Sequence, residues 1–232
     1  MIAYGICVGS DVRLERCARP GLRLVAHPEA PVAESRDNTS IGVAYNEILD
    51  AFAPDPDLEA LVLLHEDVEL RGRGFESRVR HVLGDPTIAV IGAIGGVGVE
   101  HPAWWTAPGR SGRVADSYAV RDFGSEGGGA GTGDVDAVDG LLLVLSPWAV
   151  RHLRFDQVTF PGFHGYDVDF CFQARAAGKR VVVDRIELFH HNSNASVVWH
   201  DIGQAAVAFH DKWVAPPAPA PMARPGRSAL AR

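Results

Sequence analysis

The sequence has few cysteines, no excess of positive charge and no long uninterrupted run of apolar residues. Its three cysteines (Cys7, Cys17 and Cys171) lack Cys-x-x-Cys spacing, a pattern typical of reduced thiols rather than of a disulfide framework. The 29 acidic residues outnumber the 22 lysines and arginines, so the basic surface of a nucleic-acid-binding protein is not expected. The best apolar run, residues 141–145, is far shorter than the roughly 20 residues that cross a bilayer.

Residues 1–11 lack the charged region and the small-residue cleavage site of a signal peptide and favour a first strand instead. Together with the cysteines, this predicts a cytoplasmic protein with no nucleic-acid partner and no membrane span. Three familiar motifs are also missing. The glycines of residues 91–100 do not have Gly-x-Gly-x-x-Gly spacing, no glycine cluster leads into Gly-Lys-[Ser/Thr], and Gly-x-Ser-x-Gly does not occur. A dinucleotide fingerprint, a P-loop and a serine-hydrolase nucleophile are therefore unsupported.

The composition that is present, 47% hydrophobic and 22% charged over 232 residues, is typical of one large globular domain. Short β-branched runs predict buried strands, at residues 2–8, 22–26, 60–65, 88–94 and 179–184. Helical periodicity between them predicts helices over residues 41–52, capped by Ser40, over residues 75–83 and over residues 168–177, stopped by Gly178. Strands alternating with helices predict an α/β domain with a mainly parallel central sheet.

Two segments differ from the rest of the chain in composition. Residues 95–134 contain the Trp104–Trp105 pair and six glycines between positions 124 and 133, which indicates either a long mobile loop over a binding face or a surface insertion. Residues 215–232 hold five prolines and three arginines with no acid, a composition that predicts a disordered tail. The folded domain is therefore predicted to span residues 1–214.

The most informative site follows the predicted strand at 60–65. Alternation along a strand sends His65 and Asp67 to one side and Glu66 to the other. His65 and Asp67 could then reach one divalent cation together while the cation bridges a diphosphate. The alternative is an ordinary acidic turn.

Two further clusters lie at the ends of predicted elements. Asp167 and Asp169 stand where a helix begins, which suits either helix capping or a carboxylate kept ionised as a general base. We assign Asp169 to structure and Asp167 to chemistry. His190 and His191 follow the last strand, and either imidazole could complete a metal site.

The order and spacing of the three clusters resemble the GT-A-fold glycosyltransferases of the family-2-like type, in a subgroup where the Asp-x-Asp motif reads His-x-Asp. The resemblance covers residues 1 to about 200, and its most specific part is the block at 154–183. The other matching segments are residues 6–10, 38–50, 63–70, 88–96, 135–150 and 189–193.

Carried onto this chain, the resemblance implies that Asp67 binds the metal, with His65 in place of the first Asp and with His190 or His191 closing the site. It implies that Asp167 is the base that activates the acceptor. Side chains implied to lie near the nucleotide are Ile6, Val8, Asn46 and Glu66. The chain departs from the family pattern at two positions: His65 replaces an acid, and Tyr166 replaces the Glu before the base.

The implied function is an inverting glycosyltransferase that moves a sugar from a nucleotide-sugar donor to a hydroxyl of a small-molecule, glycan or peptide acceptor, assisted by Mn²⁺ or Mg²⁺. The carboxylates fit this chemistry, because the departing diphosphate needs a cation and the attacking hydroxyl needs a base. Trp104, Trp105 and the glycine-rich loop are a predicted acceptor lid. Two alternatives are a nucleotide-sugar-binding protein that has lost turnover and a metal-dependent phosphohydrolase. The oligomeric state is left open.

Overall fold

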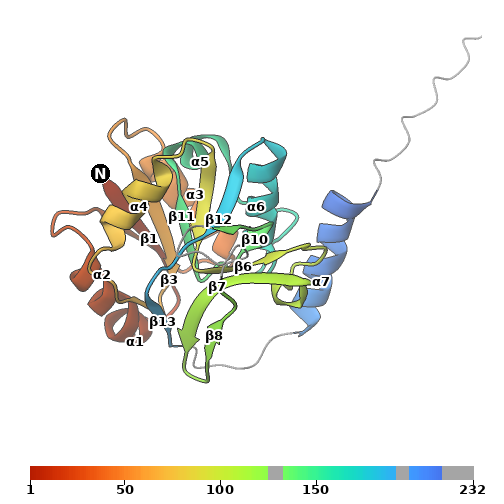
Figure 1. Ribbon diagram of the computed structural model, residues 1–232, viewed down its shortest axis with the longest axis horizontal. Coiled ribbons are helices and arrows are strands. Elements are labelled where there is room, and N and C mark those ends of the chain that lie inside the picture. The colour runs from red at the N-terminus through yellow and green to blue at the C-terminus, as the bar shows by residue number, and fades with distance from the viewer. Residues whose placement is uncertain (125–132, 192–198, 216–232) are drawn as a thin grey trace, which may run out of the picture.

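The computed structural model describes residues 1–124, 133–191 and 199–215, and within them the chain forms an α/β domain around a large central sheet (Figure 1). The sheet has seven strands in the order β2-β1-β3-β11-β5-β12-β9. Five of them run the same way, while β11 and β9 pair antiparallel with their neighbours. The predicted α/β class with a mainly parallel sheet is confirmed. The strands are β1 (Ile2–Val8), β2 (Val32–Arg36), β3 (Ala60–His65), β5 (Ile88–Gly92), β9 (Gly133–Asp134), β11 (Leu142–Leu145) and β12 (Arg180–Val183).

Helices cover both faces of this sheet, which is why its central strands are apolar throughout. Alternation along β1 sets the two sides: Tyr4 faces Phe75 of α4, whereas Gly5 faces Ile48 of α3. A Cβ at Gly5 would lie 2.6 Å from the Ile48 side chain, so glycine lets α3 pack close to the sheet. The helices are α3 (Ile41–Phe52), α4 (Phe75–Leu83), α5 (Pro147–His152) and α6 (Tyr166–Ala176).

The predicted helices are confirmed with small shifts. The last one begins two residues early, at Tyr166, and Gly178 follows it with a φ of +77°, the left-handed conformation expected after a helix. Helix α3 does begin after Ser40, but the Ser40 side chain forms no capping hydrogen bond. Its hydroxyl is instead buried without a partner in the described part of the chain.

The predicted strand at 22–26 is wrong. Residues 11–25 form a helical segment made of α1 (Asp11–Arg13), η1 (Leu14–Ala18) and α2 (Arg19–Val25). Leu22 and Val25 are buried three positions apart, which is a helical spacing, and Pro20 lies in the first turn of α2, where it needs no hydrogen bond. A short apolar run of this kind cannot distinguish the period of a helix from that of a strand.

A second sheet lies beside the first and supplies part of the site. Its order is β10-β6-β7-β13-β4, and β8 pairs with β7. The predicted strand at 88–94 divides between the two sheets, because β5 ends at Gly92 and β6 begins at Ile94. The strands of this sheet are β4 (Val68–Leu70), β6 (Ile94–Val97), β7 (Gly109–Asp116), β8 (Val120–Asp122), β10 (Ala137–Val138) and β13 (Leu188–His190).

Residues 95–134 are therefore not one long loop, because their described part contains most of β6, all of β7, β8 and β9, and the short helix η2 (Trp104–Thr106). Their glycines serve close packing between backbones. A Cβ at Gly95 would lie 2.3 Å from the carbonyl oxygen of Ala137, and Gly112 has a φ of +94° with the Ala93 carbonyl 2.2 Å from its Cβ position. The glycine-rich stretch at 125–132, part of the predicted acceptor lid, lies outside the described residues.

The C-terminal part consists of α7 (Trp199–Phe209) and η3 (His210–Val214), at the far side of the domain from α1 and α2 (Figure 1). The predicted disordered tail lies, from residue 216 onward, outside the described residues. All three cysteines are free thiols, as the sequence predicts. No helix in the described ranges combines the length and the apolar character needed to cross a bilayer.

Candidate active site

His65, Asp67 and His190 come together at one edge of the central sheet. His65 ends β3, Asp67 lies in the turn that follows, and His190 ends β13. Strand β13 pairs with β4, and the backbone N–H of His191 donates to the carbonyl of Asp67 at 2.8 Å, which fixes His190 beside the turn. One potential ligand atom from each of the three residues lies within 4.8 Å of the others.

The electrostatics of this cluster suit a cation. Burial lowers the pKa of His65, so its imidazole is neutral. Burial alone would raise the pKa of Asp67, but the hydrogen bond from His190 and the positive charge of that imidazole outweigh burial and lower the pKa. For His190 burial acts the other way and is outweighed by Asp67, 3.4 Å away, which raises the pKa. A cation would displace the His190 proton, so its binding depends on pH.

The two departures from the family pattern touch one another. The Tyr166 hydroxyl lies 2.8 Å from Nε2 of His65, and a side chain on Gly140 would collide with the Tyr166 ring. Burial raises the pKa of Tyr166 well above its ordinary value, so the phenol stays protonated. Tyr166 therefore orients His65, as outer partners orient metal-binding histidines.

Asp167 occupies the first turn of α6 and faces the same region. Its carboxylate accepts hydrogen bonds from the backbone N–H groups of Gly140 and Val168 at 2.8 and 2.9 Å. Burial and the nearby charge of Asp139 nevertheless raise its pKa from 3.8 to about 7. The sequence predicts a carboxylate held ionised by the helix N-terminus. In the structure, desolvation and the charge of Asp139 raise the pKa of Asp167 more than the backbone hydrogen bonds at the start of the helix lower it, so this pKa lies near neutral pH.

His65 and Asp167 line one cavity of about 190 Å³. Trp104 and Asp139 form its wall, with Trp104 donating its indole N–H to Asp139 at 3.1 Å. The cavity is lined by His65, Pro102, Ala103, Trp104, Trp105, Asp139, Phe163, His164, Gly165, Tyr166, Asp167 and Ile202. It thus places a candidate base and a candidate metal ligand around one small space, which we call the reaction cavity.

A second cavity of about 390 Å³ shares Trp104, Trp105 and Asp139 with the reaction cavity and also includes His190. The strands β7 and β8 form its outer wall, and we call it the hairpin cavity. Sequence reasoning missed its arginines, Arg110 and Arg121. The available signal was the alternation of residues 109–116, which the surrounding glycines obscured.

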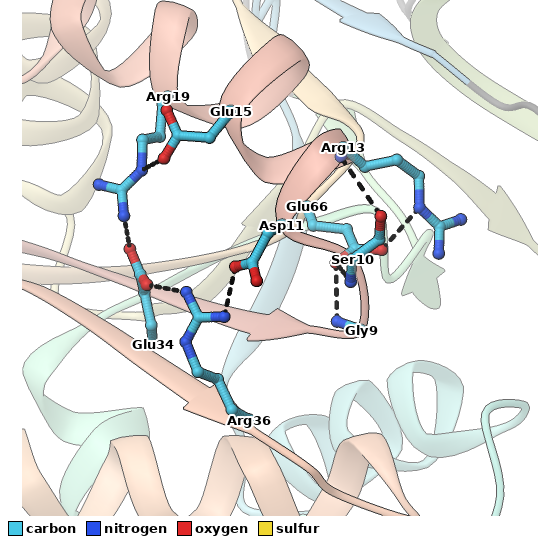
Figure 2. A network of polar contacts seen from close by, with 9 residues as sticks. All are labelled: Gly9, Ser10, Asp11, Arg13, Glu15, Arg19, Glu34, Arg36 and Glu66. Carbon is cyan, nitrogen blue, oxygen red and sulfur yellow. Dashed lines mark hydrogen bonds and ion pairs between the residues drawn. The ribbon is translucent and has the colours of Figure 1, made fainter.

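Glu66 points away from the cluster, as the alternation predicts, and is buried. Figure 2 shows its carboxylate receiving the backbone N–H groups of Gly9 and Ser10 at 2.7 and 2.6 Å, and Arg13 at 2.8 Å. Around it, Arg36 bridges Asp11 and Glu34. Both Glu66 oxygens are therefore used in holding the loop after β1 to the end of β3.

The other side chains expected near the nucleotide serve the fold. Ile6 is fully buried in the core, and Val8 is nearly so. Asn46 binds the backbone of Phe155 through both its amide nitrogen and its oxygen, at 2.9 Å each. His191 bonds with Glu69 at 2.7 Å and does not join the cluster. The structure thus brings together His65, Asp67 and His190, and places Asp167 in the lining of the reaction cavity that His65 also lines.

The fold has parallels among solved structures. GalNAc-T7, solved with UDP, GalNAc and Mn²⁺, superposes with a TM-score of 0.56 at 11% identity over 82% of this chain and 44% of that one. The mannosyltransferase PcManGT from Pyrobaculum calidifontis, solved with GDP-Man and Mn²⁺, gives 0.52 at 11% identity over 86% and 58%. The protein A197 from STIV gives 0.52 at 14% over 82% and 84%. The fold is that of the GT-A glycosyltransferases.

The sequence identifies the family directly. This chain belongs to the glycosyltransferase-like family, whose pattern matches residues 6–213, and it is an enzyme of the glycosyltransferase class. It is also 38% identical over 194 residues to the streptomycin biosynthesis protein StrF of Streptomyces griseus, a match that covers 83% of this chain and 67% of that protein. The resemblance read from the three clusters is confirmed.

Proposed function

We propose that this enzyme transfers a sugar, with inversion, from a nucleoside-diphosphate sugar to an acceptor hydroxyl, using a divalent cation held by Asp67, His65 and His190. The observation that carries the proposal is that His65, one member of this cluster, lines the same cavity as Asp167. Two solved structures of similar fold contain Mn²⁺ with a nucleotide or nucleotide sugar, which supports the same donor class here.

The residues fit a cation by their chemistry. One ionised carboxylate and two imidazoles offer ligand atoms within 4.8 Å of one another. Mg²⁺ prefers an all-oxygen octahedron, which two imidazoles do not supply, and the two solved structures of similar fold contain Mn²⁺, so we propose Mn²⁺ over Mg²⁺. When bound, the cation supplies positive charge that stabilises the departing diphosphate. Tyr166 holds His65 in place, and the hydrogen bond from His191 to the Asp67 carbonyl holds His190 beside Asp67, even when no cation is bound.

Asp167 then acts on the acceptor. As the acceptor oxygen bonds to the anomeric carbon, the Asp167 carboxylate accepts its proton, and the bond from that carbon to the donor phosphate oxygen breaks. One displacement inverts the anomeric configuration. A pKa of about 7 suits a general base, because such a group is both substantially ionised and basic at neutral pH.

We place the nucleotide at the carboxyl ends of β1 and β2, where open α/β sheets bind ligands. Val8 and Asn46 would act there through the backbone that they position, since their side chains are occupied by the core and by Phe155. Glu66 would act the same way, through the loop at Gly9 and Ser10. With reduced cysteines, a cytoplasmic site of action remains our proposal.

The test is a panel of UDP-, GDP- and dTDP-sugars, with and without Mn²⁺, scored by nucleotide release and by the anomeric configuration of the product in NMR spectra. We expect one donor class to be turned over only with Mn²⁺, giving inverted product, and we expect Asp67→Asn to lose this while Glu69→Gln keeps it. Nucleotide binding without turnover would instead indicate a binding protein. Phosphate release from simple esters would indicate a phosphohydrolase.

A further inference from the structure

The hairpin formed by β7 and β8 has two chemically different faces. Residues in a strand alternate between faces, and one face of the hairpin turns Arg110, Val114, Asp116, Arg121 and Phe123 into the hairpin cavity. The intervening residues Arg113, Ala115 and Asp122 line a separate pocket on the other side. The cavity face therefore combines two arginines with an aromatic ring beside the reaction cavity.

Arg110 is held in place by an aromatic ring and has no acidic partner among the described residues. Its guanidinium carbon lies 4.6 Å from the centre of the Phe123 ring, a stacking contact that orients the group while leaving its N–H edges open. No ion pair joins Arg110 to a carboxylate anywhere in the described ranges. Arg113, three residues on, differs because it pairs with Asp122 at 3.5 Å.

The acids of the same cavity are already satisfied by the protein. Asp116 accepts the backbone N–H groups of Tyr118 and Ala119 at 2.8 Å each and pairs with Arg121. Asp139 accepts the Trp104 indole and the N–H of Leu141. An incoming acidic group would therefore meet free N–H donors on the guanidinium groups of Arg110 and Arg121, since Asp116 uses only part of the Arg121 donors.

An exposed indole ring adjoins these arginines. Trp105 is 39% exposed and lines both the hairpin cavity and the reaction cavity. An exposed indole packs on the apolar face of a sugar ring. An acceptor whose hydroxyl reaches Asp167 would therefore extend past Trp105 toward Arg110.

We propose that the hairpin cavity is a subsite for an acidic acceptor: a sugar carrying a phosphate or carboxylate group, which Arg110 and Arg121 bind while Trp105 packs on its ring. This inference rests on the proposed function and specifies its acceptor class. Arginine suits the task because its planar donors match the oxygens of phosphate or carboxylate in pairs. The donor diphosphate is assigned to the cation cluster instead.

The test uses direct binding, by calorimetry on the full chain without metal or nucleotide. The probes are glucose 6-phosphate, glucose 1-phosphate and glucuronate, each compared with neutral glucose. We expect at least one acidic sugar to bind roughly tenfold or more tightly than glucose, as charge-assisted hydrogen bonds allow. Arg110→Gln should remove this preference, and the matched variant Arg113→Gln, on the opposite face of the same strand, should keep it.

Three results would overturn the proposal. The first is equal binding of all acidic sugars and glucose by the wild-type chain, and the second is an unchanged preference in Arg110→Gln. The third is weakened binding of UDP and GDP with Mn²⁺ in Arg110→Gln, which would assign the arginine to the donor phosphates. Asp67→Asn separates the subsite from the proposed function, because it should lose Mn²⁺-dependent nucleotide binding and retain the preference for an acidic sugar.

Discussion

The reaction cavity has two flanks of different origin. One flank comes from the central sheet and α6 and carries His65 and Asp167, each oriented by a named partner. The other comes from η2 and carries Trp105, which is 39% exposed and also borders the hairpin cavity, where the exposed Arg110 and Arg121 lie. The first flank is built for fixed geometry and the second for contact with a variable ligand. Chemistry should therefore depend on the first flank and acceptor choice on the second.

The sharpest way to break the first flank is Asp167→Asn. The amide cannot accept the acceptor proton, so the transfer rate should fall by roughly 10²–10⁴, while donor binding survives. Single-turnover transfer with a fixed donor measures this, and calorimetric donor binding is the control. A transfer rate close to wild type would show that the base lies elsewhere, with Asp139 and His164 in the same cavity as the next candidates.

The pH profile sharpens the same assignment. Because a base must be deprotonated and Asp167 has a pKa of about 7, the single-turnover rate should fall about tenfold for each pH unit below that value. Asp139→Asn removes a charge that raises this pKa, so the midpoint should move to lower pH. A midpoint unaffected by Asp139→Asn would contradict the electrostatic coupling.

The raised pKa also has a consequence for stability. The folded state holds the Asp167 proton more tightly than the unfolded state, so the contribution of this residue to stability is present below pH 3.8 and is lost as the pH rises to about 7. Asp167→Asn should remove that decline. Urea unfolding of both proteins between pH 4 and pH 8 measures the difference, and parallel stability curves would contradict it.

Asp169 lies two residues further along the same helix, and its substitution should reduce stability rather than the transfer rate. It is fully buried and accepts hydrogen bonds from Trp213, Lys212 and Gln173 at 2.8, 2.8 and 2.7 Å. Asp169→Asn turns an amide toward these donors and should cost about 2–4 kcal/mol of unfolding free energy. The exposed Asp211→Asn in η3 is the control and should change stability little. Urea unfolding measures this loss of unfolding free energy. An unchanged unfolding free energy together with a reduced transfer rate would refute the assignment of Asp169 to structure.

Trp105→Ala tests the second flank and should have the smallest effect. Loss of the indole should raise the acceptor KM by about 3- to 10-fold, as expected for one aromatic contact, with kcat nearly unchanged. Tyr118→Ala, which removes an exposed aromatic from the nearby turn, should leave KM unchanged. A fall in kcat alone would place Trp105 with the chemistry rather than with acceptor binding.

The same division governs how much the sequence could predict. The β1 and β3 ranges, 2–8 and 60–65, were predicted correctly because both are buried runs of one period. The direction of Asp67 and Glu66 followed from alternation alone. The pairing of β13 with β4, which selects His190 over His191, depends on contacts 120 residues apart and leaves no local signal. The hairpin was obscured because its glycines indicate a loop locally yet serve close packing in the fold.

His190 and His191 offer the most direct test of the proposed metal site, because they are adjacent in sequence and differ only in where the fold places them. Mn²⁺ binding, followed by the loss of the free-ion EPR signal, should be compared in wild type, His190→Gln and His191→Gln. We expect His190→Gln to weaken Mn²⁺ binding at least as much as the ~10–100-fold typical of losing an outer partner of a metal ligand, and His191→Gln to bind like wild type. Equal affinities in the two variants, or a greater loss in His191→Gln, would contradict the cluster of His65, Asp67 and His190.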